Sequence, residues 1–175
     1  MATFVERIEQ SNDNPRDLRN QEVVQPGPDP QVGNLATPIN ASALTRRYIN
    51  SLPAYRAGIS AQRRGLEVGL AHGYWLVGPF AYLNPLRHTE VTDLIGLASA
   101  SGLVVISTLM ILLYAASNPP RPLATVTTPN PPEALNSPKG WTDYARGFLI
   151  GGLLGAGIAY LLITNLGMFK AFFNP

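Results

Sequence analysis

Residues 94–116 of this chain read LIGLASASGLVVISTLMILLYAA, an apolar stretch that decides the fold class. Residues 147–169 form a second such stretch, GFLIGGLLGAGIAYLLITNLGMF, and neither contains a charged side chain. Because an α-helix rises about 1.5 Å per residue, about 20 apolar residues cross the hydrocarbon core of a bilayer. A backbone in lipid must satisfy its own N–H and C=O groups, and segments of this length without strand-like alternation do so only as helices. We therefore predict two membrane-spanning helices here.

A third apolar stretch, GLEVGLAHGYWLVGPFAYL at residues 65–83, differs from the other two because it contains Glu67 and His72. We interpret it as a further span. The predicted fold class is an all-α integral membrane protein with three transmembrane helices, at about residues 65–83, 94–116 and 147–169. The predicted organisation is a polar N-terminal tail, a transmembrane domain and a short C-terminal tail, at residues 1–64, 65–169 and 170–175.

The basic residues predict the orientation of these spans. On one side of the predicted membrane, six basic residues lie near the ends of the spans: Arg56, Arg63, Arg64, Arg121, Lys139 and Arg146. The other side carries only Arg87 and Lys170. Lysine and arginine accumulate in cytoplasmic segments, so we expect a cytoplasmic N-terminus and a cytoplasmic connection between the second and third spans. The 84–93 connection and the C-terminus are then expected on the opposite, lumenal side.

The N-terminal tail contains one candidate helix. Residues 1–31 are polar and bury too little apolar surface to offset their ordering entropy, so we expect partial disorder there. Ser42 can cap a short helix that Pro53 would stop, and its apolar side would carry Leu44, Tyr48, Ile49 and Leu52. We predict that this helix lies at the membrane interface. Ser60 is the expected N-cap of the first span.

The connection between the second and third spans is rich in proline. Residues 117–140 contain seven of the sixteen prolines of the chain, which predicts neither helix nor sheet. Such a segment favours extended polyproline II conformation and can act as a spacer or as a docking strand for a partner. A merely solvated loop is the alternative.

Small residues recur every four positions in two of the spans. The first span contains Gly65, Gly69 and Gly73, and the third contains Gly147, Gly151, Gly155 and Ala159. Such stripes let helix backbones approach closely in lipid, where hydrophobicity does little to drive helix association. Each stripe is expected to face either another helix or a flat ligand.

His72 lies about halfway along the first span, where a polar ring without a partner costs free energy. One interpretation is a buried hydrogen bond to a neighbouring helix. The other is metal ligation, and a tetrapyrrole would also use the flat surface at Gly69 and Gly73. Electron-transfer haem needs two axial side chains, and the spans contain no second histidine, whereas chlorophyll magnesium takes one axial ligand.

Glu67 also has two interpretations. Arg63 and Arg64 precede it by four and three residues, which favours a helical ion pair near the membrane surface. Alternatively, its oxygen ligates a hard cation such as magnesium. Five residues separate Glu67 from His72, which is a net rotation of about 140° and a rise of about 7.5 Å, so the two cannot share one metal.

The composition excludes several function classes. The chain has no cysteine, so it has no disulfide and no thiolate site, and its net charge of +2 is too small to indicate nucleic-acid binding. No nucleophile stands beside a base, and no span contains a carboxylate pair, so we predict a non-catalytic protein. A structural or transport subunit of some membrane complex, without pigment, is a possible alternative to a pigment-binding one.

Short motifs across the chain carry a family resemblance. The most specific is RGLEVGLAHGY at residues 64–74, which LPAYR at 52–56 precedes and PLR at 85–87 follows. Together they resemble subunit XI of photosystem I, the L subunit, over about residues 33–166. The resemblance implies a thylakoid protein of a cyanobacterium, located at the periphery of the reaction centre. It also implies contacts with the photosystem I core, small membrane subunits, neighbouring monomers and lipids.

The resemblance further implies bound antenna chlorophyll a and β-carotene, and a role in oligomerisation of the complex. Glu67 and His72 fall in the family's chlorophyll-ligand block, which makes each the implied axial ligand of a different chlorophyll magnesium. Gly69 and Gly73 are implied in close pigment or helix packing. No other metal is expected, because His88 stands where the family often has an acidic residue associated with calcium, and hard cations prefer oxygen to imidazole. Dimers or tetramers are therefore favoured over a calcium-linked trimer.

Overall fold

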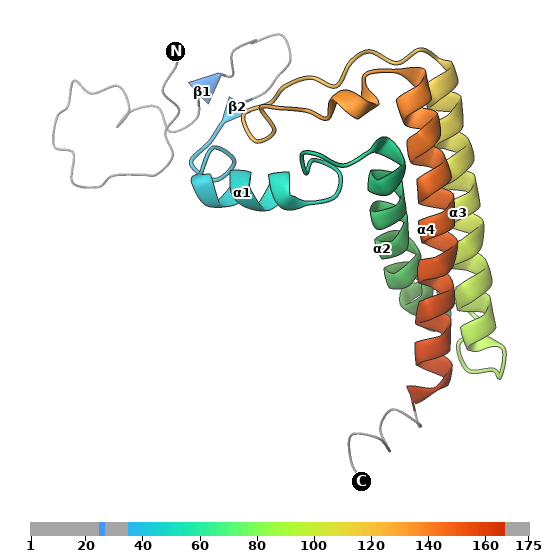
Figure 1. The fold of residues 1–175 in the computed structure, drawn as a ribbon. Coiled ribbons are helices and arrows are strands. Elements are labelled where there is room, and N and C mark those ends of the chain that lie inside the picture. The colour runs from blue at the N-terminus through green and yellow to red at the C-terminus, as the bar shows by residue number, and fades with distance from the viewer. Residues whose placement is uncertain (1–24, 27–34, 167–175) are drawn as a thin grey trace, which may run out of the picture. The chain divides into compact units, whose positions relative to one another are not determined.

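The computed structural model describes residues 25–26 and 35–166 of the chain (Figure 1). It contains four α-helices, α1 (Ala43–Ser51), α2 (Ala61–Tyr82), α3 (Thr92–Ala116) and α4 (Pro138–Thr164), and a 3-10 turn, η3 (Glu133–Leu135). Two short antiparallel strands, β1 (Gln25–Pro26) and β2 (Leu35–Ala36), pair Gln25 with Ala36 and Pro26 with Leu35. The predicted helical class is confirmed. The predictions for residues 1–24, 27–31 and 170–175 lie outside the described residues.

Side-chain caps fix the starts of three helices. The backbone N–H groups of Thr45, Arg63 and Gly140 donate to the hydroxyls of Ser42, Ser60 and Ser137, each at 3.2 Å. These bonds satisfy N–H groups that the first turn of a helix otherwise leaves unpaired. The predicted caps at Ser42 and Ser60 are confirmed.

The start of α4 corrects the prediction for the proline-rich connection. We predicted neither helix nor sheet through residue 140, but η3 forms at Glu133–Leu135 and α4 begins at Pro138. Proline is tolerated at the first helical position, because its missing N–H would have no partner there and its φ already suits a helix. Lys139 and Arg146 pair with Asp143, with N–O distances of 2.6 and 3.4 Å. The apolar part of α4 therefore begins at residue 147, as predicted.

Two of the helices are long and apolar enough to cross a membrane. Within the described ranges these are α3 and α4, which match two of the three predicted spans. Residues 61–82 form the expected helix, α2, which continues through Pro79, but its length and composition do not by themselves establish it as a span.

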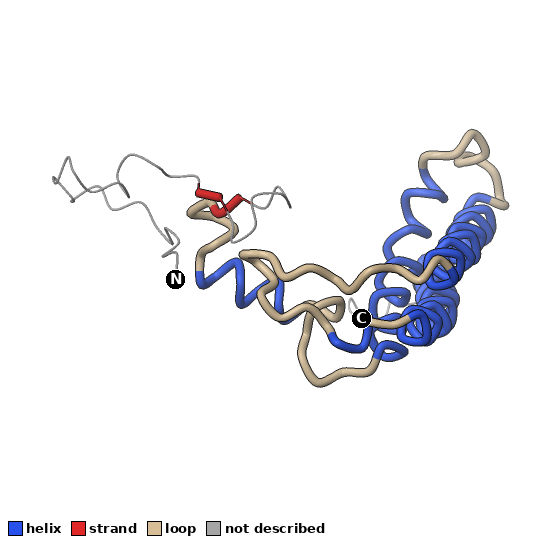
Figure 2. Tube along the Cα trace, turned by 90° about the horizontal axis from the view of Figure 1, so that it is seen from above, coloured by secondary structure: helices blue, strands red, loops and turns tan. Residues whose placement is uncertain are grey.

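The helices α2, α3 and α4 pack together in one compact unit, made of residues 59–121 and, within the described part of the chain, 134–166 (Figures 1 and 2). Its buried apolar cluster consists of Val77, Ala100, Ala156 and Ala159, which Leu76, Phe80, Leu97 and Ile163 flank. The α2 and α4 backbones approach closely and run parallel, because successive glycines of α2 meet successive turns of α4. The side chains of this unit are small where helices cross, which suits packing in lipid.

A second unit combines the described residues up to Gly58 with residues 122–133 of the connection. Its described part has a small apolar cluster of Ala36, Ala41 and Val126. The Asn50 amide donates to the Thr127 carbonyl at 2.8 Å, and the Thr127 hydroxyl donates to the Asn40 carbonyl at 3.2 Å. The middle of the proline-rich connection is therefore bonded to the chain's own N-terminal segment.

Candidate functional site

His72 lies on α2 with its side chain exposed, and its Nδ1 atom is 2.8 Å from the Val68 carbonyl oxygen. A carbonyl oxygen only accepts, so Nδ1 must carry the proton and donate. In the neutral imidazole the lone pair then stays on Nε2. One interpretation of His72 was a hydrogen bond to a neighbouring helix. The hydrogen bond of Nδ1 is instead made within α2, to Val68.

The ring of His72 also contacts the neighbouring helix. The Phe148 ring of α4 lies edge-to-face with the imidazole, with centroids 5.5 Å apart and planes at 62°. Phe148 is 5% exposed and belongs to an aromatic row along α4 that also includes Trp141 and Tyr144. One side of the imidazole thus packs on protein, while the residue remains accessible from outside the helix bundle.

Glu67 makes the ion pair that the sequence suggested. Its Oε1 atom lies 2.9 Å from Nε of Arg63, four residues earlier on α2. The Glu67 side chain is 26% exposed and the Arg63 side chain 66% exposed, so solvent or headgroups reach both partners. Exposed pairs of this kind contribute little to stability, roughly 0–1 kcal/mol. The pair can therefore open at small cost if another cation competes for the carboxylate.

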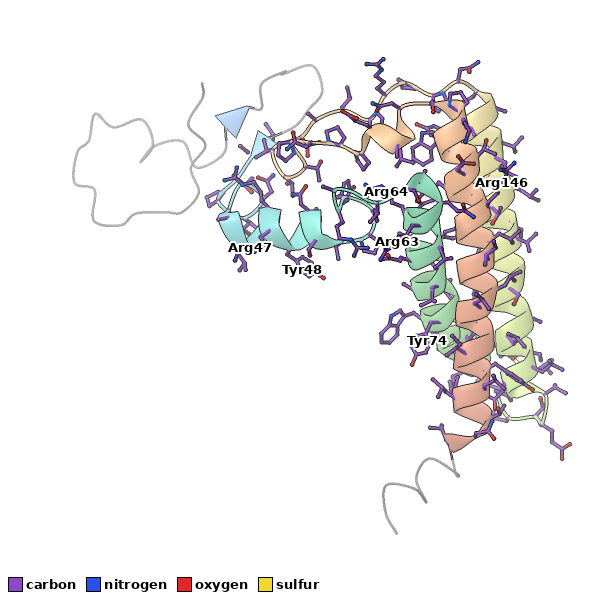
Figure 3. All side chains as sticks on the ribbon, in the orientation of Figure 1. Arg47, Tyr48, Arg63, Arg64, Tyr74 and Arg146 are labelled. Atoms are coloured by element: carbon purple, nitrogen blue, oxygen red, sulfur yellow. The ribbon has the colours of Figure 1, made fainter. Side chains whose placement is uncertain are left out.

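Arg63 and Arg64 differ in their surroundings although they are adjacent. Both lie at the N-terminal end of α2, and Arg146 lies towards the same end of the parallel helix α4 (Figure 3). Arg64 is only 3% exposed, whereas Arg63 reaches outward to Glu67. Arg63, Arg64 and Arg146 therefore lie towards one end of the bundle, where Glu67 and Asp143 offset part of their charge.

Gly69 and Gly73 face the α4 backbone. A Cβ atom built on Gly69 would lie 2.8 Å from the Cα atom of Phe148 and nearer still to the Phe148 carbonyl oxygen. A Cβ on Gly73 would meet the Gly152 carbonyl in the same way. The stripe of α4 is reciprocal, since Gly147, Gly151 and Gly155 meet the carbonyls of Gln62, Leu66 and Leu70. Both stripes therefore pack against each other, and the glycines offer no open surface for a flat ligand.

His72 and Glu67 could each supply one ligand atom to a metal-centred group, and they point to different groups rather than to one shared metal. His72 provides a single neutral imidazole nitrogen, and Glu67, on another side of the same helix, provides carboxylate oxygens. A flat metal-centred cofactor would need only one such side chain at each position. The outward face of α2 also presents aromatic surface, with Trp75 73% exposed and in edge contact with Tyr74 at 5.6 Å.

Sequence reasoning missed the aromatic contribution to this site. Phe148 reaches His72 only because Gly69 lets the two backbones meet, and Trp75 was not singled out at all. A signal existed for Phe148, which directly follows Gly147 of the small-residue stripe. The spacing of the stripe does not say, however, which helix it faces or in which register.

Comparison with known proteins gives one consistent result. A family described as photosystem I reaction centre subunit XI matches residues 22–168, which include all four α-helices. Proteins named photosystem I reaction center subunit XI from Mastigocladus laminosus and Nostoc punctiforme are each 54% identical to this chain. The alignments cover 98% of this chain and 99% and 100% of those relatives. A similarly named protein from a Picosynechococcus strain is 56% identical, with 84% of this chain and 97% of the relative covered.

Proposed function

Because this chain belongs to the photosystem I reaction centre subunit XI family, we propose that it binds chlorophyll a and β-carotene within photosystem I and mediates contacts between copies of that complex. Membership places the chain in photosystem I and in the thylakoid membrane, and replaces the alternative of a subunit of another membrane complex. Its role in the complex is non-catalytic, since chlorophyll itself supplies the light absorption and excitation transfer. The chain's own residues bind and orient the pigments.

The pigment proposal is supported by the state of His72. Its Nδ1–H is engaged by the Val68 carbonyl, so Nε2 is the atom that can ligate magnesium. The bond also limits rotation of the ring and raises the basicity of the ligating nitrogen. This arrangement resembles the way in which metal-binding histidines generally hold their second nitrogen.

We assign Glu67 to a different chlorophyll. Magnesium prefers oxygen ligands, and a carboxylate on a separate side of α2 leaves room for a second macrocycle. The ion pair with Arg63 balances part of the charge of the carboxylate, which would otherwise be costly near the hydrocarbon region.

We also propose that α2 is a transmembrane helix, on an argument from connectivity. The bonds between Asn50 and Thr127 and between Thr127 and Asn40 keep the N-terminal segment and the 122–133 segment on one side of the membrane. The C-terminal end of α3 leads into the 122–133 segment, so a membrane-spanning α3 begins on the opposite side of the bilayer. The short connection at 83–91 joins the start of α3 to the end of α2. The end of α2 is then on the opposite side from its start, so α2 must cross as well.

In this topology the N-terminal segment and the connection before α4 are cytoplasmic, and residues 83–91 are lumenal. The α2 helix spans about 33 Å at about 1.5 Å per residue, which is close to the thickness of the hydrocarbon core.

Oligomerisation is proposed through surfaces that the bundle leaves exposed. The outward side of α3 is almost wholly aliphatic, and its exposed side chains include Leu94, Val105, Ile106, Leu109, Met110 and Leu113. β-Carotene, an apolar polyene without a ligand atom, would be held by side chains of this kind.

The 122–133 segment is bonded to the N-terminal segment. Any contact that the 122–133 segment makes with another copy therefore involves the whole folded unit rather than a free strand.

His88 lies exposed in the connection between α2 and α3, at the position where the family often has an acidic residue. Imidazole replaces a hard oxygen ligand there, which favours dimers or tetramers over a calcium-linked trimer. Native gels of the purified complex, run with and without a chelator, measure this directly. Trimers that dissociate on chelation would contradict it.

The decisive test of pigment binding compares the two histidines of the chain. His72→Leu is expected to lose about one chlorophyll per complex, since leucine has no ligating atom, while the subunit remains assembled. His88→Leu is the matched control and is expected to retain the full pigment content. Chlorophyll per purified complex is measured after solvent extraction, with subunit content checked on the same sample. Unchanged chlorophyll in His72→Leu would refute ligation by His72.

A further inference from the structure

Two contacts from different helices hold the imidazole of His72. The first is the hydrogen bond from Nδ1 to the Val68 carbonyl at 2.8 Å, within α2. The second is the edge-to-face contact with the Phe148 ring of α4, with centroids 5.5 Å apart and planes at 62°. The hydrogen bond decides which nitrogen is left for a ligand. The ring contact limits how far the imidazole can tilt towards α4.

Phe148 is itself fixed on several sides. Its side chain is buried, and its ring stacks on Tyr144 with centroids 6.4 Å apart and planes at 17°. Its backbone lies against Gly69, one helical turn before His72, where α2 and α4 pack closely. A ring held in this way cannot swing aside, so it constrains the imidazole beside it.

We propose that Phe148 is a positioning residue that sets the orientation of the His72 imidazole and thereby the plane and the absorption of the chlorophyll bound there. This proposal rests on the proposed function of His72 as an axial ligand. A pigment held by Nε2 of His72 would follow the orientation of the imidazole, so a tilt of the imidazole would be passed to the pigment. Phe148 acts through His72 and needs no contact with the pigment itself.

The alternative role of Phe148 is to fill the α2–α4 interface, with no influence on the imidazole. The two roles differ in what a change of side chain does to the spectrum. Leucine and methionine are apolar, and can occupy much of the space of the ring, but neither has a flat ring edge against which an imidazole packs. Tyrosine keeps the ring.

The experiment uses photosystem I purified with the full-length subunit. Three variants change the proposed residue: Phe148→Leu, Phe148→Met and Phe148→Tyr. His72→Leu identifies the absorption and circular dichroism bands of the chlorophyll in question. Phe80→Leu is the matched control, because Phe80 is an aromatic side chain packed against the Val77 cluster of the same bundle. Chlorophyll content, low-temperature absorption and circular dichroism are measured on each complex.

The expected result is that Phe148→Leu and Phe148→Met retain the full chlorophyll content but shift the band that disappears in His72→Leu. Phe148→Tyr is expected to restore the wild-type position of that band, and Phe80→Leu to leave it unchanged. An unshifted band in Phe148→Leu and Phe148→Met, with the pigment lost in His72→Leu, would overturn the positioning role and leave the proposed function intact.

The remaining outcomes are also decisive. An equal shift in Phe80→Leu would show a general effect of repacking and would overturn the proposal. Failure of both Phe148→Leu and Phe148→Met to assemble, when Phe80→Leu assembles, would show that Phe148 serves folding instead. Retention of all chlorophyll in His72→Leu would refute the proposed function itself.

Discussion

Replacing Gly73 by alanine tests the packing that positions the site. A Cβ at residue 73 would lie 2.8 Å from the Ala156 nitrogen and nearer still to the Gly152 carbonyl oxygen, whereas ordinary van der Waals contact begins at 3.4 Å. The obstacle is backbone, which cannot rotate away as a side chain can. The α4 helix must therefore move outward, and this movement also loosens its contacts with Gly65 and Gly69.

The magnitude follows from this geometry. Overpacking a well-packed interior costs about 1–3 kcal/mol, and a backbone obstacle places Gly73→Ala near 3 kcal/mol. Gly157 lies in the partner helix α4, and a Cβ there would meet nothing within 4 Å. Gly157→Ala is therefore expected to stabilise the helix by about 0.5–1 kcal/mol, because alanine loses less conformational entropy than glycine. The same chemical change is thus expected to have opposite signs at these two positions of the packed helix pair.

Unfolding of the purified chain by sodium dodecyl sulfate in mixed micelles measures both values, with tryptophan fluorescence as the signal. Trp75 reports on α2 and Trp141 on α4. A free energy of unfolding lowered equally by both substitutions would refute the packing argument. So would a Gly73→Ala variant as stable as the wild type.

The chain has no cysteine, so single cysteines at Ser117 and His88 can be labelled in sealed membranes without background. We expect the cysteine at residue 117 to be labelled from the cytoplasmic side and the cysteine at residue 88 from the lumenal side. Labelling of both cysteines from the same side would contradict the proposed crossing of α3. Asn50→Ala removes the donor to the Thr127 carbonyl. Limited proteolysis is therefore expected to cut residues 118–132 faster in this variant than in the wild type. An unchanged rate of cutting would contradict this expectation. Glu67→Gln removes the charge that Arg63 pairs with and is expected to change the free energy of unfolding by less than about 1 kcal/mol. A larger loss of unfolding free energy would show that the ion pair is structural.

Local chemistry made much of the fold predictable. Ser42 and Ser60 cap their helices as expected, because a side-chain acceptor before an apolar helical segment acts through bonds to the next few residues. The prediction of no helix through residue 140 was wrong at its end, because α4 begins at Pro138. Its first turns are polar and begin with proline, so the hydropathy that marks the apolar part does not mark the helix.

The candidate ligands were predictable for a similar reason. Ionisable side chains within an apolar stretch are costly, so Glu67 and His72 stand out in the sequence. The ion pair of Glu67 was also foreseen, since a spacing of four residues brings side chains together on any helix. The use of Gly69 and Gly73 was left open between a helix and a flat ligand, because a small-residue stripe fits both.

The sequence by itself determined most of the four α-helices, the caps at Ser42 and Ser60 and the two polar residues of α2, because each depends on neighbours within about one helical turn. Only the tertiary structure decided that the two glycine stripes face each other in parallel, that Phe148 meets His72, and that Thr127 is bonded to Asn50. These contacts join residues far apart in the chain. Their pairing is set by which backbones can approach most closely once all the helices compete for the same partners.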